Sequence, residues 1–201
     1  MISRRSVAAY LGGGAALAGG VLALGWWQVD GPGAKNPAPL LPLPLSEMSF
    51  SMQDHTGKEV TPQGLLGKAS LVFFGYTFCP DVCPTTLSDI TVWLNELGED
   101  AALLNAIFIT VDPERDTQAA MAQYMGYFHP DIRGWRGSLA ETDKAIAGFN
   151  ASYSLGEGED YTVEHSSSVF LFQPDGRLAA MIDLHEDREQ GLAKIRRVLQ
   201  P

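Results

Sequence analysis

Two apolar runs, at residues 68–74 and 106–111, constrain the fold of this chain more than any other feature of its sequence. Both are rich in β-branched and aromatic residues, which is the pattern of a strand buried on both faces of a sheet. An amphipathic run over 85–97 lies between them, and a helical pattern over 117–128 follows the second. Strand, helix, strand and helix in this order predict a parallel βαβ unit with a right-handed crossover.

Further patterns predict antiparallel and helical elements around this unit. Turn-forming residues between short apolar runs indicate one hairpin before the first central strand and another near the C-terminus. Helical periodicity predicts two more helices. In chain order these elements are the hairpin 49–61, a short connection at 135–137, the helix 141–153, an acidic glycine-rich loop at 156–160, the hairpin 168–182 and the helix 187–199.

The first thirty residues are expected to lie outside this fold. Residues 6–29 carry no charge, follow Arg4 and Arg5, and end near two tryptophans. A helix of this length would span roughly 36 Å, enough for a hydrocarbon core of about 30 Å, and the preceding arginines favour a cytoplasmic N-terminus. We therefore expect residues 1–29 to be a single-pass anchor in the inner membrane. A cleaved export signal, with an Ala-x-Ala sequence at 16–18, is the alternative.

Either interpretation places the rest of the chain on the periplasmic or extracytoplasmic side. Residues 30–46 hold five prolines and are expected to form a semi-rigid tether. The net charge is −10, and the only charges before Asp30 are two arginines, so residues 30–201 carry −10 − 2 = −12. Such an acidic domain argues against nucleic acid as a partner.

Both cysteines of the chain, Cys79 and Cys83, follow the first central strand. We expect the next helix to begin at Pro84, because proline is favoured at the first helical position. Cys83 would then cap that helix, and the helix dipole would lower the pKa of its thiol. In an oxidising compartment the pair could instead be a structural disulfide, although so short a loop gains little stability from a bridge.

Three motifs carry a resemblance to a known family. They are Cys79-Pro-Asp-Val-Cys83-Pro84, Val111-Asp-Pro-Glu-Arg-Asp116-Thr117, and His165-Ser-Ser with Phe170-Leu-Phe-Gln-Pro-Asp-Gly176. Over about residues 47–199 the chain resembles the α/β thioredoxin-like fold, a central mixed sheet flanked by helices. Within that superfamily it is similar to the Sco/SenC family of copper-binding assembly factors for cytochrome c oxidase.

This resemblance implies one copper ion, Cu(I) or Cu(II), held by Cys79, Cys83 and His165. It also implies a membrane-anchored metallochaperone rather than an enzyme, with the copper-site subunit of cytochrome c oxidase and other copper carriers as partners.

The chemistry of the residues supports the same site. In a thioredoxin-like sheet the strand 168–172 runs antiparallel to the cysteine-bearing strand, so His165 would lie at the same edge as the cysteines. Two thiolates and an imidazole suit copper, whereas Ca²⁺ and Mg²⁺ require oxygen ligands. His185 is the rival third ligand, while His55 and His129 are expected to be surface or cap residues.

Two other functions use the same cysteines. A thiol-disulfide reductase acting on the oxidase copper-site cysteines would use them as a redox pair. Three residues separate the cysteines here, where thioredoxin-type enzymes typically have two, and His165-Ser-Ser stands where their cis-proline is expected, so metal binding is favoured. A peroxiredoxin ranks third, since its Thr-x-x-Cys motif has no clear counterpart.

Three aspartates, Asp81, Asp112 and Asp116, are expected to support the ligands or contact a partner. The alternative for the last two is a plain loop in which Asp116 or Thr117 caps the following helix.

Overall fold

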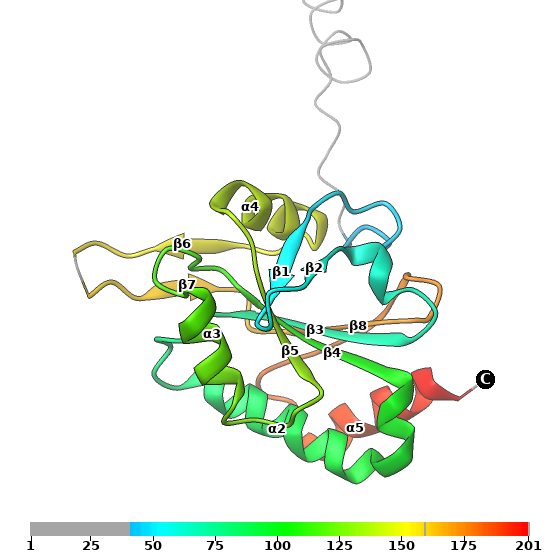
Figure 1. Ribbon diagram of the computed structural model, residues 1–201. Helices are drawn as coiled ribbons and strands as arrows, with labels where there is room; N and C mark the ends of the chain where they lie inside the picture. Colours follow the sequence, from blue (N-terminus) through cyan, green and yellow to red (C-terminus); the bar gives the residue numbers. More distant parts are fainter. Residues whose placement is uncertain (1–40, 159, 201) are drawn as a thin grey trace, which may run out of the picture. The chain divides into compact units, whose positions relative to one another are not determined.

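The computed structural model describes residues 41–158 and 160–200, which form a seven-stranded sheet with helices on both faces (Figure 1). The strand order is β2-β1-β5-β4-β3-β8-β9. Strands β3, β4 and β5 are mutually parallel, and the other pairings are antiparallel. The strands are β1 (Met52–Asp54), β2 (Glu59–Val60), β3 (Ala69–Gly75), β4 (Leu104–Thr110), β5 (Ile132–Arg136), β8 (Val169–Phe172) and β9 (Leu178–Ile182).

The predicted βαβ unit is confirmed by β3, α2 and β4. Every residue of β3 is buried, and Phe73 pairs with Phe108 of β4 in parallel register. Strand β8 lies antiparallel on the other side of β3, as the thioredoxin-like arrangement requires. Both central strands therefore end at one edge of the sheet, which is where open α/β sheets place their sites.

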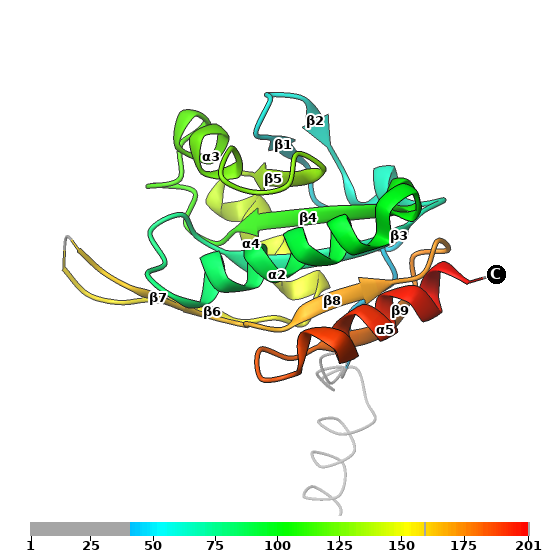
Figure 2. The same cartoon turned by 90° about the horizontal axis from the view of Figure 1, so that it is seen from below.

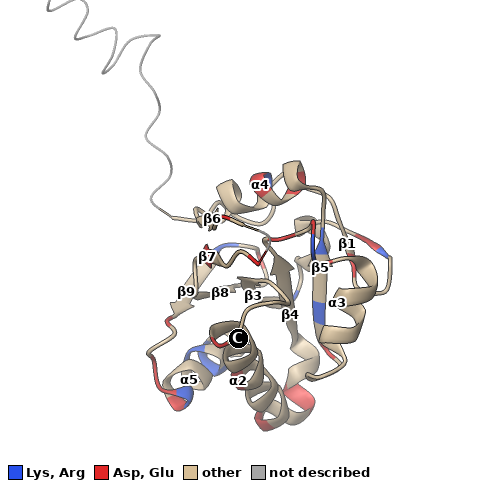
Figure 3. Cartoon of the chain, turned by 90° about the vertical axis from the view of Figure 1, so that its left-hand side faces the viewer, with Lys and Arg blue, Asp and Glu red and all other residues tan. Residues whose placement is uncertain are grey.

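Helices α2 (Val82–Leu97), α3 (Gln118–Met125) and α5 (Arg188–Leu199) cover one face of the sheet, and α4 (Leu139–Gly148) covers the other (Figures 1 and 3). The indole of Trp93 joins two of them by donating a hydrogen bond to the carbonyl of Arg188, at 2.9 Å. Two 3₁₀ helices, η1 (Pro62–Leu65) and η2 (Gly98–Leu103), precede β3 and β4.

Aromatic side chains fill the space under α4. The ring of Phe149, at the C-terminal cap of this helix, lies 5.0 Å from Phe74, 5.4 Å from Phe170 and 5.5 Å from Phe172 between centroids. Edge-to-face contacts of this kind add to the hydrophobic gain of burial. The cluster joins α4 to the neighbouring strands β3 and β8.

One local expectation was wrong. Residues 135–137 were expected to be a connection, yet Trp135 belongs to β5, which pairs with β4. The strands on either side of the predicted loop at 156–160 were not expected: β6 (Tyr153–Leu155) and β7 (Val163–His165) form a second, two-stranded sheet. His165 is the last residue of β7.

The hairpin β6–β7 extends beyond the end of the main sheet (Figures 1 and 2). Within the described residues its strands pair only with each other. Its position relative to the sheet therefore depends on side-chain contacts, which are described with the site below.

Packing against the domain reaches into the expected tether, residues 30–46. Leu45 is fully buried, and its amide donates to the carbonyl of Gly176 at 2.9 Å. The expected anchor at 1–29 and the first part of the expected tether, to residue 40, lie outside the described residues. Across 41–158 and 160–200, no helix combines the length and apolarity that crossing a membrane requires.

Candidate metal centre

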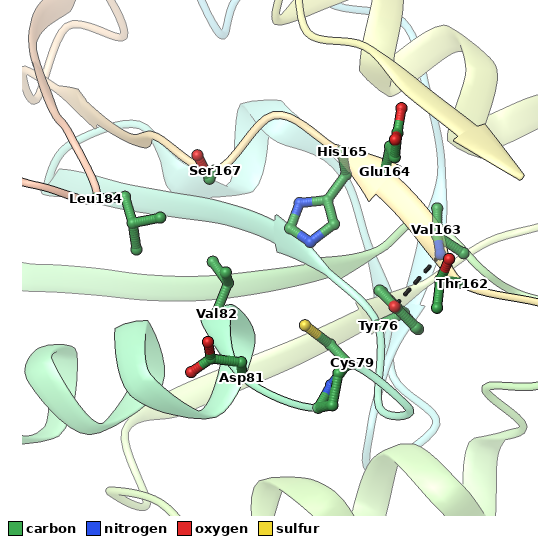
Figure 4. A pocket seen from close by; sticks show the side chains of 11 residues that line it. Tyr76, Cys79, Asp81, Val82, Thr162, Val163, Glu164, His165, Ser167 and Leu184 are labelled. Atoms are coloured by element: carbon green, nitrogen blue, oxygen red, sulfur yellow. Dashed lines mark hydrogen bonds between the residues drawn. The ribbon is translucent and has the colours of Figure 1, made fainter. Parts of the chain in front are cut away.

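The structure brings Cys79, Cys83 and His165 together at the carboxyl end of β3. Their potential ligand atoms all lie within 4.8 Å of one another, and Cys83 Sγ is 3.4 Å from His165 Nε2. Figure 4 shows the thiol of Cys79 and the imidazole of His165 facing the same space. This is the one group of three or more His, Cys, Asp or Glu side chains with such spacing in the part of the chain that the structure describes.

Cys83 is fully buried in the first turn of α2. The helix begins at Val82 with Asp81 as its N-cap, so the expected start at Pro84 was wrong. Proline is tolerated at the third helical position, because the first amides of a helix have no partner within it.

The expected lowering of the Cys83 pKa was also wrong. Burial raises the pKa of this thiol, and a hydrogen bond involving Cys79 raises it further. Desolvation of a thiolate outweighs the partial positive charge of the helix end. A metal ion that binds Cys83 must therefore displace its proton.

The backbone beside Cys83 has no space for a side chain. A Cβ atom on Gly75 would lie 2.7 Å from Cys83 Sγ and 2.6 Å from Cε2 of Phe108. Only glycine at this strand end lets the buried thiol approach the sheet so closely.

Cys79 lies in the turn between β3 and α2 and is partly exposed. Its amide donates to the carbonyl of Tyr76 at 3.2 Å, and its Sγ accepts the amide of Cys83 at 3.4 Å. The turn thus holds the partly exposed thiol of Cys79 close to the backbone of the buried Cys83.

His165 is held in a defined orientation. Its Nδ1 lies 3.0 Å from the carbonyl oxygen of Ser166, which can only accept, so Nδ1 carries the proton and Nε2 presents a lone pair to Cys83. Burial lowers the pKa of the imidazole, which keeps it neutral at pH 7. The rings of Tyr76 and Phe73 pack edge-on against it, at 5.9 and 6.1 Å between centroids.

A cavity of about 400 Å³ opens beside the three donors (Figure 4). Cys79 and His165 line it, together with mostly apolar groups from the turn before α2, from β7 and from Leu184. Cys79 and His165 are therefore reachable from solvent through a largely apolar opening.

The other histidines do not join this group. His185 is exposed and is not among the clustered donors, so it is not the third member. His55 accepts the amide of Gly134 through Nδ1 at 3.1 Å, and it is half-buried, not exposed as expected. His129 Nδ1 accepts the amide of Asp131 at 3.2 Å.

The three expected aspartates have different surroundings. Asp81 is exposed at the rim of the cavity. Asp116 is fully buried, and burial raises its pKa although its carboxylate accepts the amide and hydroxyl of Thr77 and the hydroxyl of Thr110. Thr117, and not Asp116, caps α3 by accepting the amide of Ala120.

Asp112 is buried in a separate group that the sequence did not reveal. Its carboxylate pairs with Arg115 and accepts the hydroxyl of Tyr161 at 2.9 Å. The amide of Val163 donates to the hydroxyl of Tyr76 at 3.3 Å. Arg115 lies inside one of the motifs, but its partner Tyr161 is 46 residues away, and no sequence pattern indicates that contact.

Chemically, the centre offers two sulfur donors and one neutral nitrogen donor within a small, partly enclosed volume. Soft metal ions with low coordination numbers suit this donor set, and Cu(I) is the leading example. Both thiols are free, so the same two cysteines could also act as a dithiol redox pair.

Comparison with known proteins agrees with the fold and identifies the family. The model of the SCO1/SenC family matches residues 42–200. Protein SCO1 of Saccharomyces cerevisiae is 36% identical over 151 residues, covering 73% of this chain and 51% of that protein. The human SCO1 homologue is 35% identical over 163 residues, covering 79% of this chain and 54% of that protein. The chain thus spans about half the length of these mitochondrial relatives.

Two solved structures of similar proteins contain copper. ScoI of Bradyrhizobium japonicum with copper bound is 40% identical, with a TM-score of 0.71 and coverage of 79% of this chain and 99% of that one. Copper-bound yeast Sco1 is 35% identical, with a TM-score of 0.70 and coverage of 79% and 88%. With its thioredoxin-like sheet and a family match over nearly the whole described region, the chain belongs to the SCO1/SenC family.

Proposed function

We propose that this protein is a copper metallochaperone that binds one copper ion through Cys79, Cys83 and His165. The observation that carries the proposal is the convergence of these three donor atoms within 4.8 Å of one another. The copper-bound states of two similar proteins support the choice of metal. The buried Cys83 and the neutral His165 would hold the ion from one side, while Cys79 faces the opening.

The recipient in this proposal is the copper-site subunit of cytochrome c oxidase, with other copper carriers as donors. Transfer would proceed by ligand exchange, because the partly exposed Cys79 can be replaced first by an incoming thiolate. Family membership supports the choice of recipient.

An anaerobic copper titration of the reduced full-length protein tests this function. The wild type is expected to retain one Cu(I) per chain against a competing chelator, and His165→Ala is expected to bind it much more weakly. His185→Ala removes an exposed histidine and serves as the matched control. A wild type that retains no stoichiometric copper would refute the metallochaperone.

A second candidate function, thiol-disulfide reductase, is favoured by the unequal exposure of the cysteines. Cys79 is partly exposed and Cys83 is buried, an arrangement suited to an attacking and a resolving thiol. The thiolate of Cys79 would attack a disulfide of the target and release one target thiol, and Cys83 would then attack the sulfur of Cys79 in the mixed disulfide and release the second. Two electrons pass to the target, whose two sulfurs leave as thiols, while Cys79 and Cys83 become a disulfide.

His165→Ala separates the two functions. Reduction of a test disulfide is expected to persist in this variant while copper binding falls, since only the metal needs the imidazole. Loss of both activities together would argue that His165 serves the thiols as well as the metal.

The proposal also includes a location. Residues 1–29 would anchor the chain in the inner membrane, the part of 30–46 that precedes the packed Leu43 and Leu45 would act as its tether, and the domain would lie on the periplasmic side. A reporter fused after Pro201 should be active only outside the cytoplasm. Cytoplasmic activity would contradict this topology.

A further inference from the structure

Arg115 contacts both halves of the metal centre without offering a ligand. Its Nε donates to the buried carboxylate of Asp112, and its Nη1 donates to the backbone carbonyl of Tyr161 at 2.8 Å. Asp112 and Arg115 follow β4, whereas Tyr161 leads into β7, the strand that carries His165. One side chain thus joins the main sheet to the separate hairpin.

Aromatic rings surround the same guanidinium. Its central carbon lies 3.6 Å from the ring centroid of Tyr161, 5.1 Å from that of Phe78 and 5.7 Å from that of Tyr76. Phe78 and Tyr76 belong to the turn that carries Cys79, and Tyr161 belongs to the hairpin. Guanidinium groups at such distances are attracted to ring faces, more strongly where water is displaced. The cation therefore holds the cysteine turn and the histidine hairpin together.

Besides Arg115, side-chain contacts hold the hairpin in place: the Tyr153 hydroxyl donates to Asp143 of α4 at 2.7 Å, and Val163 is buried in the core. Strands β6 and β7 pair only with each other among the described residues, so no ladder fixes β7 to the main sheet. The carboxylate of Asp112 accepts the Tyr161 hydroxyl at 2.9 Å, and the hydroxyl of Tyr76 accepts the amide of Val163 at 3.3 Å. Arg115 orders this small network, because it pairs with Asp112 and stacks on Tyr161.

We propose that Arg115 is a positioning residue for His165, holding the β6–β7 hairpin so that Nε2 faces Cys79 and Cys83. The proposal rests on the proposed copper site and goes beyond it by assigning a role to a residue that touches no metal. Outer partners that orient a histidine ligand typically contribute 10–100-fold to metal affinity, on the order of the effect expected here.

A double-mutant cycle tests the copper side of this role in the full-length protein. Arg115→Ala is expected to weaken Cu(I) retention about tenfold or more. In a His165→Ala background the same substitution should cause no further loss, because Arg115 acts through a ligand that is already missing. Arg115→Lys should restore only part of the affinity, since lysine keeps the charge but not the planar, stacked fork.

A second measurement needs no copper. In the metal-free protein, Arg115→Ala should accelerate amide hydrogen exchange in the hairpin, for example at Gly156 and Ser166, about tenfold or more, while the amides of β3 keep their protection. Arg177→Ala, which removes an arginine from an exposed pair with Asp175, is the matched control and should change neither readout.

Tyr161→Ala removes the same contact from the hairpin side. It takes the place of Arg115→Ala if the arginine variant fails to fold. The positioning role would be overturned if Arg115→Ala, or Tyr161→Ala in its place, bound copper as tightly as the wild type. It would also be overturned if the double variant with His165→Ala lost affinity by the product of the two single losses. A wild type without copper would instead refute the proposed function. Hydrogen exchange would then still decide whether Arg115 holds the hairpin, since unchanged exchange at Gly156 and Ser166 would show that it does not.

Discussion

At the scale of single residues, the centre depends on places where the backbone is approached very closely. Gly75 is one of them, because a Cβ atom there would lie 2.6 Å from Phe108 and 2.7 Å from the Cys83 sulfur. Neither neighbour can yield easily, since both are fully buried. The position of the Cys83 sulfur, a proposed copper ligand, is thus set by the absence of a side chain at Gly75, the last residue of β3.

Gly75→Ala is expected to lower the free energy of unfolding by about 1–3 kcal/mol and to weaken copper retention by displacing Cys83. Urea unfolding and a chelator titration measure the two effects. Gly64→Ala is the control, because a Cβ at Gly64 would meet nothing within 4 Å. Unchanged stability and copper retention in Gly75→Ala would contradict the described packing.

Asp54 provides a prediction of pH dependence. Burial raises its pKa, but hydrogen bonds from the hydroxyl and amide of Thr56 and the amide of Lys58 outweigh burial, so the pKa lies below its ordinary value. A carboxyl with a lowered native pKa stabilises the fold fully above its unfolded pKa of about 3.9, and this contribution is lost as the pH falls through the native value.

Asp54→Asn should therefore lower the free energy of unfolding by about 1 kcal/mol at neutral pH. The difference from wild type should shrink below about pH 4. Urea unfolding across this range measures it, with the exposed Asp100→Asn as control. If the difference in unfolding free energy between wild type and Asp54→Asn stayed constant as the pH fell below about 4, the ionised carboxylate would not be its source.

At the scale of elements, strands with long apolar runs could be predicted from the sequence, whereas short strands with interrupted or missing patterns could not. Strands β3 and β4 were predictable because long apolar runs have few alternatives to burial. Strand β5 was missed because Gly134 and two arginines interrupt its short apolar pattern. Strands β6 and β7 were missed because three residues each, beside a glycine-rich acidic loop, form no recognisable period.

The same contrast applies to the candidate site. The convergence of Cys79, Cys83 and His165 was predictable because the cysteines follow β3 and His165 lies shortly before β8, and both of these strands have clear apolar patterns. The burial of Cys83 was not predictable, since it depends on Phe108 and on the helix starting at Val82. The contacts of Arg115 depend on a fold that brings distant parts of the chain together.

Helix α4 gives a prediction at this scale, because Phe149 joins it to the sheet through contacts with Phe74, Phe170 and Phe172. Phe149→Ala should cost about 3–5 kcal/mol of unfolding free energy. Copper stoichiometry at low temperature should remain one, since the cluster lies on the face opposite α2. Tyr127→Ala, at a side chain that is 73% exposed, should be nearly neutral. A neutral Phe149→Ala would show that α4 is not held by this ring.

At the scale of the whole molecule, the centre joins parts of the chain that are far apart in sequence. Cys83 lies in α2 and His165 lies in β7, and 82 residues separate them in the sequence. A metal bound by both must dissociate when the domain unfolds. Binding and folding are therefore linked.

Anaerobic Cu(I) is accordingly expected to raise the unfolding temperature. A free concentration 1,000 times the dissociation constant adds about 4 kcal/mol to stability. His165→Ala should show a much smaller rise at the same copper concentration, and removal of copper by a chelator should reverse it. Equal stabilisation of both proteins would mean that the hairpin donor is not engaged.

The buried Leu45 has a consequence for the layout of the domain. Its amide bonds to Gly176, in the turn that follows β8, whereas the cysteines follow the other end of the neighbouring strand β3. The seven residues of β3 span about 20 Å. Leu45 and the two thiols therefore lie toward opposite ends of β3, with the length of a whole strand between them.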